Sequence, residues 1–395
     1  MTIKFIDDID VREKRVFIRA DFNVPLDENR NITNDNRITA TLPTLQYVLD
    51  NGGAVICASH LGRPKGKPVP AMSLKPVADR LSELLGLKVQ FVDDCISDEA
   101  AAAGRALNPG EVLLLENLRF YPEEEKNDAA FAEKLGAAAD IFISDAFAVS
   151  HRAHASVEAI TRVIPVCAAG FLMKKEIQSF ENAMTHPKRP LAAVIGGAKV
   201  SGKLEVLENL IQKVDCMIVG GGMAFTFLKA QGKEIGKSLV EEDLVDTAKA
   251  ILAKAKEKGL KLLLPVDCVI ARECKSGSEC RTVSADAIPA EWMGLDVGPE
   301  TVEQFCQTIK EANTVVWNGP MGVFEIDEFS KGTYAVSDCI AQSGCMSIVG
   351  GGDSVSALKK SGNQDKVSFV STAGGAFMEL MEGKTLPGIA ALDKQ

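Results

Sequence analysis

Arginine and histidine side chains in the first half of the chain recur at the ends of short apolar segments. They are Arg19 with Asp21 and Asn23, Arg37, His60 with Arg63, Arg119, and His151 with Arg152 and His154. A guanidinium fork pairs well with carboxylate or phosphate, so several such groups at one sheet edge would bind a small, highly charged anion. Each arginine could instead pair with a nearby acid, but the recurrence at strand ends favours the anion pocket.

Five apolar segments in the second half of the chain run directly into glycines. They are AVIGGAK (193–199), MIVGGGM (217–223), VVWNGPMG (315–322), SIVGGGD (347–353) and FVSTAGG (369–375). Glycine lets backbone amides approach a phosphate where a helix begins, and parallel sheets bind ligands at the carboxyl ends of their strands. One such loop is weak evidence, but five predict a site for a nucleotide or another polyanion.

Two lysines belong to the first of these glycine loops. GAKVSGK at 197–203 has the spacing of a P-loop, but Leu204 stands where that loop needs a Ser or Thr hydroxyl for magnesium. GKEIGKS at 232–238 is one residue too short, so we reject the Walker fold. A helix that starts at 201–203 would place Lys199 and Lys203 beside a bound phosphate, although ordinary surface lysines are the alternative.

Two acidic residues of the second half have alternative roles. Asp353 follows three glycines, where a carboxylate either caps a helix or binds magnesium. Glu325 either caps a helix or accepts a hydrogen bond from a ribose hydroxyl, and the sequence does not distinguish the two. No Ser-His-Asp set and no cysteine with a neighbouring base stands out.

The elements that must position these residues alternate along the whole chain, with short β-branched segments between helical patterns. This alternation is typical of βαβ units, and strands such as GAVICASH are continuous apolar runs, as expected of strands covered on both faces. We predict an α/β fold of two Rossmann-like domains, each a parallel sheet covered by helices, joined by a helix and a hinge. The candidate boundary is THPKRP at 185–190, after the amphipathic KKEIQSFENAM at 174–184.

Length and composition are those of a globular protein with two or three domains. The 395 residues are 46% hydrophobic and 25% charged, and 44 basic against 54 acidic residues give a net charge of −10. That balance is the opposite of a non-specific nucleic-acid binder. The amino-terminal MTIKFIDDID does not resemble a signal peptide, and no apolar run approaches the roughly 18 residues of a membrane span.

Ten cysteines are spread singly along the chain, without a CxxC pair. This pattern suits free thiols in a reducing compartment. We therefore expect a cytoplasmic protein with no nucleic-acid partner and no membrane partner.

Taken together, these motifs resemble the phosphoglycerate kinase family. RADFNVPL at 19–26 is similar to that family's signature, and nine further motifs follow in the family's order across nearly the whole chain: SHLGRP, LENLRF, SHRAH, GGAKVSGK, VGGG, WMGLD, WNGPMGVFE, VGGGDS and FVSTAGGA. The resemblance implies reversible, magnesium-dependent phosphoryl transfer from 1,3-bisphosphoglycerate to ADP, giving ATP and 3-phosphoglycerate, in glycolysis and gluconeogenesis. It also implies a monomer whose two lobes close by hinge bending.

The resemblance further implies how the chain is divided. Residues 1–172 would hold the glycerate substrate, 173–189 would form the connecting helix and hinge, and 190–382 would bind the nucleotide. The tail 383–395 would return to pack on the first domain.

Matching the family's motifs residue by residue implies the site residues. The glycerate site would consist of Asp21, Phe22, Asn23, Arg37, His60, Leu61, Gly62, Arg63, Arg119 and Arg152. The nucleotide site would consist of Lys203, Gly294, Asn318, Pro320, Glu325, Gly351, Gly352, Asp353 and Ser354, with Gly374 and Gly375 in a loop that stabilises the phosphate. The catalytic residues would be Arg37, Lys199 and Lys203, and Asp353 would bind Mg²⁺.

The chain departs from the family's pattern at three positions. Ala373 stands where a third glycine is usual, Ser354 where threonine is common, and Met321 where valine is frequent. The reaction itself suits the residues, because the attacking oxygen is already anionic in either direction and no general base is needed.

Two other functions share some of these features. A two-domain NAD-dependent dehydrogenase would also have glycine loops, but the chain has no clean G-x-G-x-x-G followed by an acidic residue about 20 positions later. A hinged binding protein for a phosphorylated small molecule would also use an arginine pocket. Turnover with ADP would distinguish it from the kinase.

Overall fold

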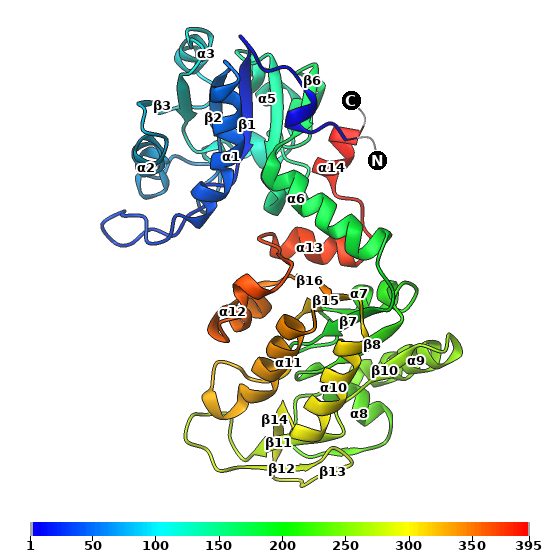
Figure 1. Ribbon diagram of the computed structural model, residues 1–395. Coiled ribbons are helices and arrows are strands. Elements are labelled where there is room, and N and C mark those ends of the chain that lie inside the picture. The colour runs from blue at the N-terminus through cyan, green and yellow to red at the C-terminus, as the bar shows by residue number, and fades with distance from the viewer. Residues whose placement is uncertain (1–2, 394–395) are drawn as a thin grey trace. The chain divides into compact units, whose positions relative to one another are not determined.

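We describe a computed structural model over residues 3–393, which form two compact units (Figure 1). Residues 3–177 and 385–393 make up the first unit, and residues 178–384 make up the second. The chain passes from one to the other within α6 (Phe171–Phe180), which continues as a π-helical turn (Glu181–Thr185). Residues 1–2 and 394–395, part of the predicted first domain and tail, lie outside the described residues.

The first unit is built on a six-stranded parallel sheet with the order β3-β4-β2-β1-β5-β6. Its strands are β1 (Arg15–Ala20), β2 (Ala54–Ala58), β3 (Val89–Val92), β4 (Val112–Leu115), β5 (Ile141–Asp145) and β6 (Val166–Ala169). Its helices are α1 (Asn36–Asp50), α2 (Lys75–Leu85), α3 (Asp98–Arg105), α4 (Pro122–Glu125), α5 (Ala129–Gly136) and α14 (Pro387–Asp393). Every residue of β2, β4 and β5 is buried, as expected of strands covered on both faces.

The second unit has the same design. Its parallel sheet has the order β10-β8-β7-β15-β16-β17, formed by β7 (Leu191–Ile195), β8 (Cys216–Val219), β10 (Lys261–Leu263), β15 (Thr314–Asn318), β16 (Met346–Val349) and β17 (Phe369–Val370). Its helices are α7 (Leu204–Leu210), α8 (Met223–Ala230), α9 (Val245–Glu257), α10 (Pro299–Glu311), α11 (Lys331–Gln342), α12 (Gly352–Lys360) and α13 (Gly374–Met381). Separate apolar cores pack against this sheet.

Two small sheets extend the second unit. An antiparallel sheet of the order β12-β11-β14 is formed by β11 (Asp267–Ala271), β12 (Cys280–Ser284) and β14 (Met293–Val297). A short parallel pair joins β9 (Glu234–Ile235) to β13 (Ala287–Ile288). The alternating pattern of the sequence did not predict these sheets, because β11, β12, β13 and β14 follow one another without a helix between them.

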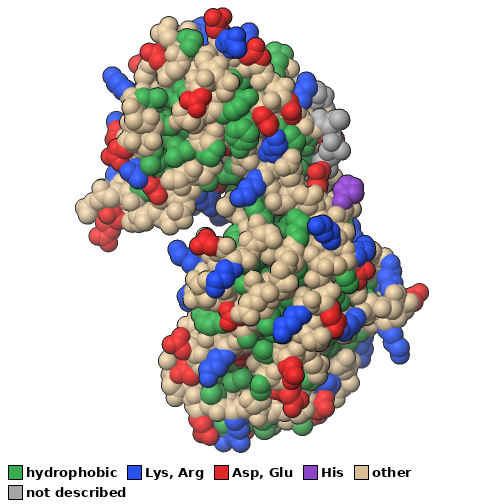
Figure 2. Space-filling view, in the orientation of Figure 1, with side chains coloured by type: hydrophobic (Ala, Val, Ile, Leu, Met, Phe, Trp, Pro, Cys, Tyr) green, Lys and Arg blue, Asp and Glu red, His purple; other side chains and the backbone are tan. Residues whose placement is uncertain are grey.

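The predicted fold class is confirmed, since each unit contains one six-stranded parallel sheet covered by helices. One boundary was wrong: the helix expected to start at 201–203 begins at Leu204, with Lys203 in the N-cap position. Among the described residues, no helix is long and apolar enough to cross a membrane. Basic and acidic side chains are interspersed over the visible face of the molecule (Figure 2).

The expectation that all ten cysteines are free thiols was wrong. Cys306 of α10 and Cys339 of α11 form a disulfide, with 5.5 Å between their Cα atoms. The two helices pack side by side on the same sheet, so cysteines 33 positions apart in the sequence meet. The other eight cysteines are free thiols.

Candidate active site

The predicted glycerate residues of the first unit gather at one edge of its sheet. Asp21 to Asn23 follow β1, His60 to Arg63 follow β2, Arg119 lies in a helical turn after β4, and Arg152 lies in the segment after β5. Because the strands are parallel, their carboxyl ends share this edge. Arg37 joins the group from the first turn of α1.

Direct contacts connect these residues to one another. The Arg37 guanidinium forms an ion pair with the Asp21 carboxylate. Asn23 Oδ1 accepts a hydrogen bond of 2.8 Å from the backbone N–H of Gly62, and Arg119 donates one of 3.0 Å to the Gly62 carbonyl. The residues that the motif match assigns to one site are therefore brought together by the fold.

A fully buried arginine lies at the base of this cluster. Arg19, in β1, donates from Nε to Ser156 Oγ at 2.8 Å, and its Nη2 lies 3.3 Å from His60 Nδ1. The Ser156 hydroxyl and backbone N–H in turn donate to the two carboxylate oxygens of Glu124, at 2.6 and 2.9 Å. Sequence analysis placed Arg19 at a strand end but did not find Glu124 or Ser156. Glu124 is one of three consecutive glutamates, and only its tertiary contacts distinguish it.

The cluster is strongly positive, and the imidazoles of His60 and His154 are neutral. Burial, reinforced by the positive charges of Arg19 and Arg119, holds the pKa of His60 well below its usual value. The same causes lower the pKa of His154 to about 4. Burial and the charge of Arg19 lower the pKa of Arg119 to about 10, which leaves its guanidinium charged at neutral pH. Guanidinium groups therefore supply the positive charge, as an anion site requires.

The remaining predicted glycerate residues differ in accessibility. Phe22 is 0% exposed and Leu61 is 4% exposed, so both side chains belong to the core beneath the loop. Arg63 is exposed, and Arg152 donates from Nε to His151 Nε2 at 3.1 Å. Phe22 and Leu61 thus shape the loops, whereas Arg63 and Arg152 present charge to solvent.

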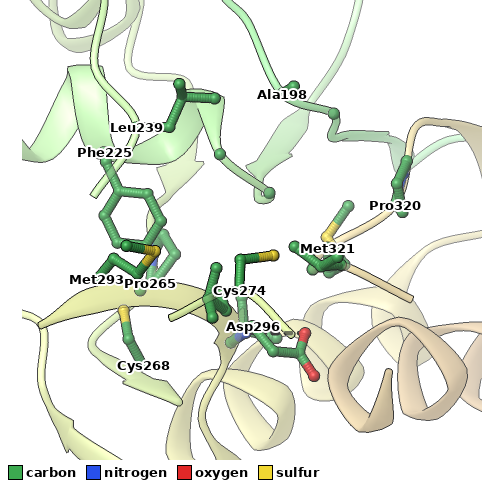
Figure 3. Close-up of a pocket in the computed structure, with 18 of the residues that line it drawn as sticks. Ala198, Phe225, Leu239, Pro265, Cys268, Cys274, Met293, Asp296, Pro320 and Met321 are labelled. Atoms are coloured by element: carbon green, nitrogen blue, oxygen red, sulfur yellow. Dashed lines mark hydrogen bonds between the residues drawn. The ribbon is translucent and has the colours of Figure 1, made fainter. Parts of the chain in front are cut away.

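The glycine loops of the second unit surround a cavity of about 480 Å³ (Figure 3). Four of the predicted nucleotide residues line it: Gly294, Pro320, Glu325 and Asp353. Apolar side chains form much of its wall: Phe225, Leu239 and Met293, which the sequence analysis did not single out, and Met321, one of the departures from the family's pattern. A largely apolar pocket with a carboxylate at its rim suits a heterocyclic base and its sugar.

Glycine is required at two places, one in the wall of this cavity and one in the loop that leads into it. Gly319 has a φ of +99°, and a Cβ atom there would lie 2.1 Å from the carbonyl oxygen of Gly196. A Cβ atom on Gly294 would lie 2.1 Å from Cζ of Phe225. Any side chain at either position would displace the loop or the ring that shapes the cavity.

Two predicted nucleotide residues hold the loops instead of opening into the cavity. Asn318 Nδ2 donates to the carbonyl of Gly350 at 2.7 Å, and Ser354 Oγ accepts a hydrogen bond of 2.5 Å from the N–H of Gly319. Both side chains are buried. A threonine hydroxyl would serve as well as that of Ser354, so this departure from the family's pattern leaves the loop's anchor in place.

Thr333 supports one of these loops and Asp296 lines the cavity, and sequence analysis assigned a role to neither. The buried hydroxyl of Thr333 accepts hydrogen bonds from the backbone N–H groups of Met321 and Gly322, at 3.0 and 3.1 Å. Burial raises the pKa of Asp296, which lines the cavity, to about 7. A buried threonine within a helical pattern gives no local sign of such a role.

The predicted lysines lie on the segment that follows β7. Lys203 Nζ is 3.4 Å from Met378 Sδ, and burial lowers the pKa of Lys203 to about 8, partly offset by the carboxylates of Asp353 and Glu382. Lys199 is exposed. The charge of the Lys203 ammonium group therefore changes with pH closer to neutrality than that of an ordinary lysine. Its position in the sequence did not indicate this.

The remaining predicted glycines begin helices. Gly351, with a φ of +95°, immediately precedes α12, which starts at Gly352. Gly374 and Gly375 open α13, and the preceding Ala373 has a φ of −113°, which alanine adopts without strain. The substitution of alanine for the family's usual glycine therefore does not distort this loop.

Comparison with known proteins agrees with this geometry. Residues 6–384 match the family model for phosphoglycerate kinase. The chain belongs to the phosphoglycerate kinase family. It is 60% identical over its whole length to a curated phosphoglycerate kinase from Geotalea daltonii, covering 99% of that protein. It is 53% identical to a cytosolic phosphoglycerate kinase from Triticum aestivum, with 98% of each chain covered.

Solved structures of the family show the same fold. A phosphoglycerate kinase from Coxiella burnetii superposes with a TM-score of 0.95 at 44% identity, covering 99% of both chains. One from Pyrococcus horikoshii gives a TM-score of 0.81 at 32% identity, covering 99% of this chain and 98% of that one. The resemblance seen in the motifs is thus confirmed, and family membership makes the chain a glycolytic kinase instead of a dehydrogenase or a binding protein.

Proposed function

We propose that the chain catalyses reversible, magnesium-dependent phosphoryl transfer from 1,3-bisphosphoglycerate to ADP, giving ATP and 3-phosphoglycerate. In this proposal residues 1–172, with the tail 383–395, form the glycerate domain and residues 190–382 form the nucleotide domain. The enzyme acts as a cytoplasmic monomer in glycolysis and gluconeogenesis. The observation that carries the proposal is the cationic cluster of the first unit in a chain of this family.

The glycerate site is proposed at that cluster. A phosphorylated glycerate carries several negative charges in a small volume, and guanidinium forks match both its carboxylate and its phosphate. Arg37 and Arg119 supply such forks, and neutral His60 offers a hydrogen bond without further charge. The ion pair of Arg37 with Asp21 keeps the guanidinium oriented until an anionic substrate competes for it.

The nucleotide is proposed to occupy the 480 Å³ cavity. Phe225, Leu239 and Met321 would contact the base, and the exposed carboxylate of Glu325 would accept a hydrogen bond from the ribose. The phosphates would then lie along the glycine loops that end at Asp353 and Lys203, where backbone amides and an ammonium group favour negative charge.

The residues present fit magnesium held through the nucleotide. Among residues 3–393, no group of three or more histidine, cysteine or acidic side chains is arranged to hold a metal ion alone. Asp353 is an exposed carboxylate at the first turn of α12 on the cavity wall. One carboxylate combined with phosphate oxygens is a usual magnesium environment, and the bound ion would neutralise phosphate charge.

The transfer needs positioning and charge cancellation, not a general base. In either direction the attacking oxygen belongs to an ionised carboxylate or phosphate, so no proton has to be removed. Arg37, Lys199 and Lys203 are proposed to offset the charge of the phosphoryl group in transfer. Closure of the two domains about the hinge at 173–189 would exclude water, which competes with ADP as the acceptor.

A coupled assay tests this function. The protein is mixed with ATP, magnesium and 3-phosphoglycerate, and 1,3-bisphosphoglycerate is followed through its NADH-dependent reduction. Rapid turnover that disappears when magnesium is chelated is expected. Absence of turnover from a folded protein that binds both substrates would contradict the proposal.

A further inference from the structure

The first unit contains a second cavity, of about 470 Å³, at the carboxyl ends of β3 and β4. The segment 68–75 covers one side, and Phe120 and Tyr121 form another. Its described lining includes none of the residues proposed to hold the glycerate. The volume lies within the range of small-molecule sites, and ligands of parallel sheets bind at this edge.

Arg30 lines this cavity with an unusual backbone and an unsatisfied side chain. Its φ is +66°, in the left-handed region that side chains other than glycine rarely adopt, at the tip of a hairpin closed by the bridge between Leu26 and Ile32. Its Nε atom is buried and has no hydrogen-bond partner within residues 3–393. A strained arginine with a buried, unpaired donor indicates a missing acceptor.

Glu116 provides the opposite charge in the same cavity. Its side chain is 5% exposed, and Oε1 accepts hydrogen bonds from the backbone N–H groups of Leu74 and Asn117, at 2.8 and 2.7 Å. Within the described part of the chain, no donor contacts its second oxygen. A nearly buried carboxylate with one open oxygen favours a ligand that donates hydrogen bonds.

Of the other charged groups that line the cavity, Asp93 and Lys75 are exposed, and Lys75 forms an ion pair with Asp79 on its own helix. Asp94 accepts hydrogen bonds from the Tyr121 hydroxyl at 2.7 Å and from the N–H of Ile96 at 2.8 Å. Arg30 also borders a neighbouring, more open groove of about 520 Å³, but there Asp35 and Arg80 form an ion pair of 2.8 Å with each other. Arg30 and Glu116 are thus the two oppositely charged groups of the lining that are at least partly buried and still have bonding capacity.

We propose that this cavity binds a free α-amino acid with an apolar side chain. The guanidinium of Arg30 would take the carboxylate, the open oxygen of Glu116 would take the ammonium group, and Val69, Pro70 and Phe120 would contact the apolar side chain. An anion alone would leave Glu116 unpaired, and an amine alone would leave Arg30 unpaired. The site is independent of the proposed kinase reaction.

Calorimetric titration with L-phenylalanine tests the site in the wild-type chain and three variants. For a ligand of this size we expect a Kd of about 1 mM. Arg30→Gly removes the guanidinium while suiting the left-handed backbone, so the protein should fold and bind at least about tenfold more weakly. Glu116→Gln should also weaken binding. Glu13→Gly, at another left-handed residue with a φ of +57°, is the matched control and should bind normally.

Two analogues separate the roles of the charges. 3-Phenylpropionate lacks the ammonium group and 2-phenylethylamine lacks the carboxylate, and each should bind at least about tenfold more weakly than L-phenylalanine. The proposal is overturned if the wild type does not bind L-phenylalanine up to its solubility limit, if Arg30→Gly binds like the wild type, or if either analogue binds equally well.

Discussion

The two units present different chemistry from the same scaffold. Each has a six-stranded parallel sheet, and in each the candidate site lies where strands end. In the first unit charged side chains gather at those ends, with Arg37 held by Asp21 and Arg119 by the Gly62 carbonyl. In the second they carry glycines and a cavity with apolar walls. The residues that follow each strand, and not the architecture, therefore decide what each sheet can bind.

The largest effect is expected from Arg37→Ala. The first unit would lose the cation proposed to act on the transferred group, and kcat should fall by about a hundredfold to a thousandfold. Steady-state kinetics in the coupled assay measure this. Arg15→Ala is the matched control, since it breaks a partly exposed ion pair with Asp140 at the opposite end of β1 and should leave kcat unchanged. Near-normal turnover by Arg37→Ala would reject its catalytic role.

A smaller effect, confined to the second unit, is expected from Asp353→Ala. Loss of the proposed magnesium ligand should weaken the binding of magnesium-ADP by about tenfold to a hundredfold. Calorimetry with and without magnesium measures the change. Asp365→Ala removes an exposed carboxylate elsewhere in the same unit and should have no effect. Equal weakening in the absence of magnesium would show that Asp353 does not act through the metal.

The two sites should also respond differently to pH. Lys203 binds phosphate only when protonated, and because its pKa is lowered to about 8, ADP affinity should fall as pH rises from about 7 to about 9, by up to about tenfold. Affinity for 3-phosphoglycerate should stay nearly constant over this range, because His60 is already neutral and Arg119 remains mostly charged. Lys203→Arg should abolish the pH dependence for ADP, and a dependence that persists would exclude Lys203 as its source.

The smallest effect is expected from Thr333→Val. This change keeps the shape of the side chain but leaves the N–H groups of Met321 and Gly322 without their acceptor, so the KM for nucleotide should rise by about threefold to tenfold. The KM for 3-phosphoglycerate and kcat should be preserved, and Thr333→Ser should restore the nucleotide KM. A rise in both KM values would indicate general destabilisation of the enzyme instead of loop positioning.

Much of this organisation could be predicted from the sequence, because it depends on local patterns. Continuous apolar segments such as the one forming β2 predicted buried parallel strands. The glycines after β15 predicted a loop open to a ligand, and the structure adds that Gly319 lies against the backbone of Gly196. The clustering of Asp21 and Arg119 followed from the rule that parallel strands share one carboxyl edge, whereas the expectation that Arg37 lies at a strand end was wrong, since it joins the cluster from α1.

Features that depend on contacts between distant residues could not be predicted. Arg19 reaches Ser156 across 137 positions, and the Cys306–Cys339 disulfide depends on how two helices pack. The lowered pKa of Lys203 arises from tertiary burial. Asn318 and Ser354 belong to motifs that the resemblance assigns to the nucleotide site, but only the structure shows that their side chains support the glycine loops.

The proposal that each unit binds one substrate is tested most directly by calorimetric titration of each substrate into the wild type and two single-site variants. 3-Phosphoglycerate and magnesium-ADP are titrated separately into wild type, Arg37→Ala and Asp353→Ala. We predict that Arg37→Ala binds magnesium-ADP normally and 3-phosphoglycerate more weakly, and that Asp353→Ala shows the reverse. Loss of both ligands in either folded variant, or loss of neither, would contradict the assignment of one substrate to each unit.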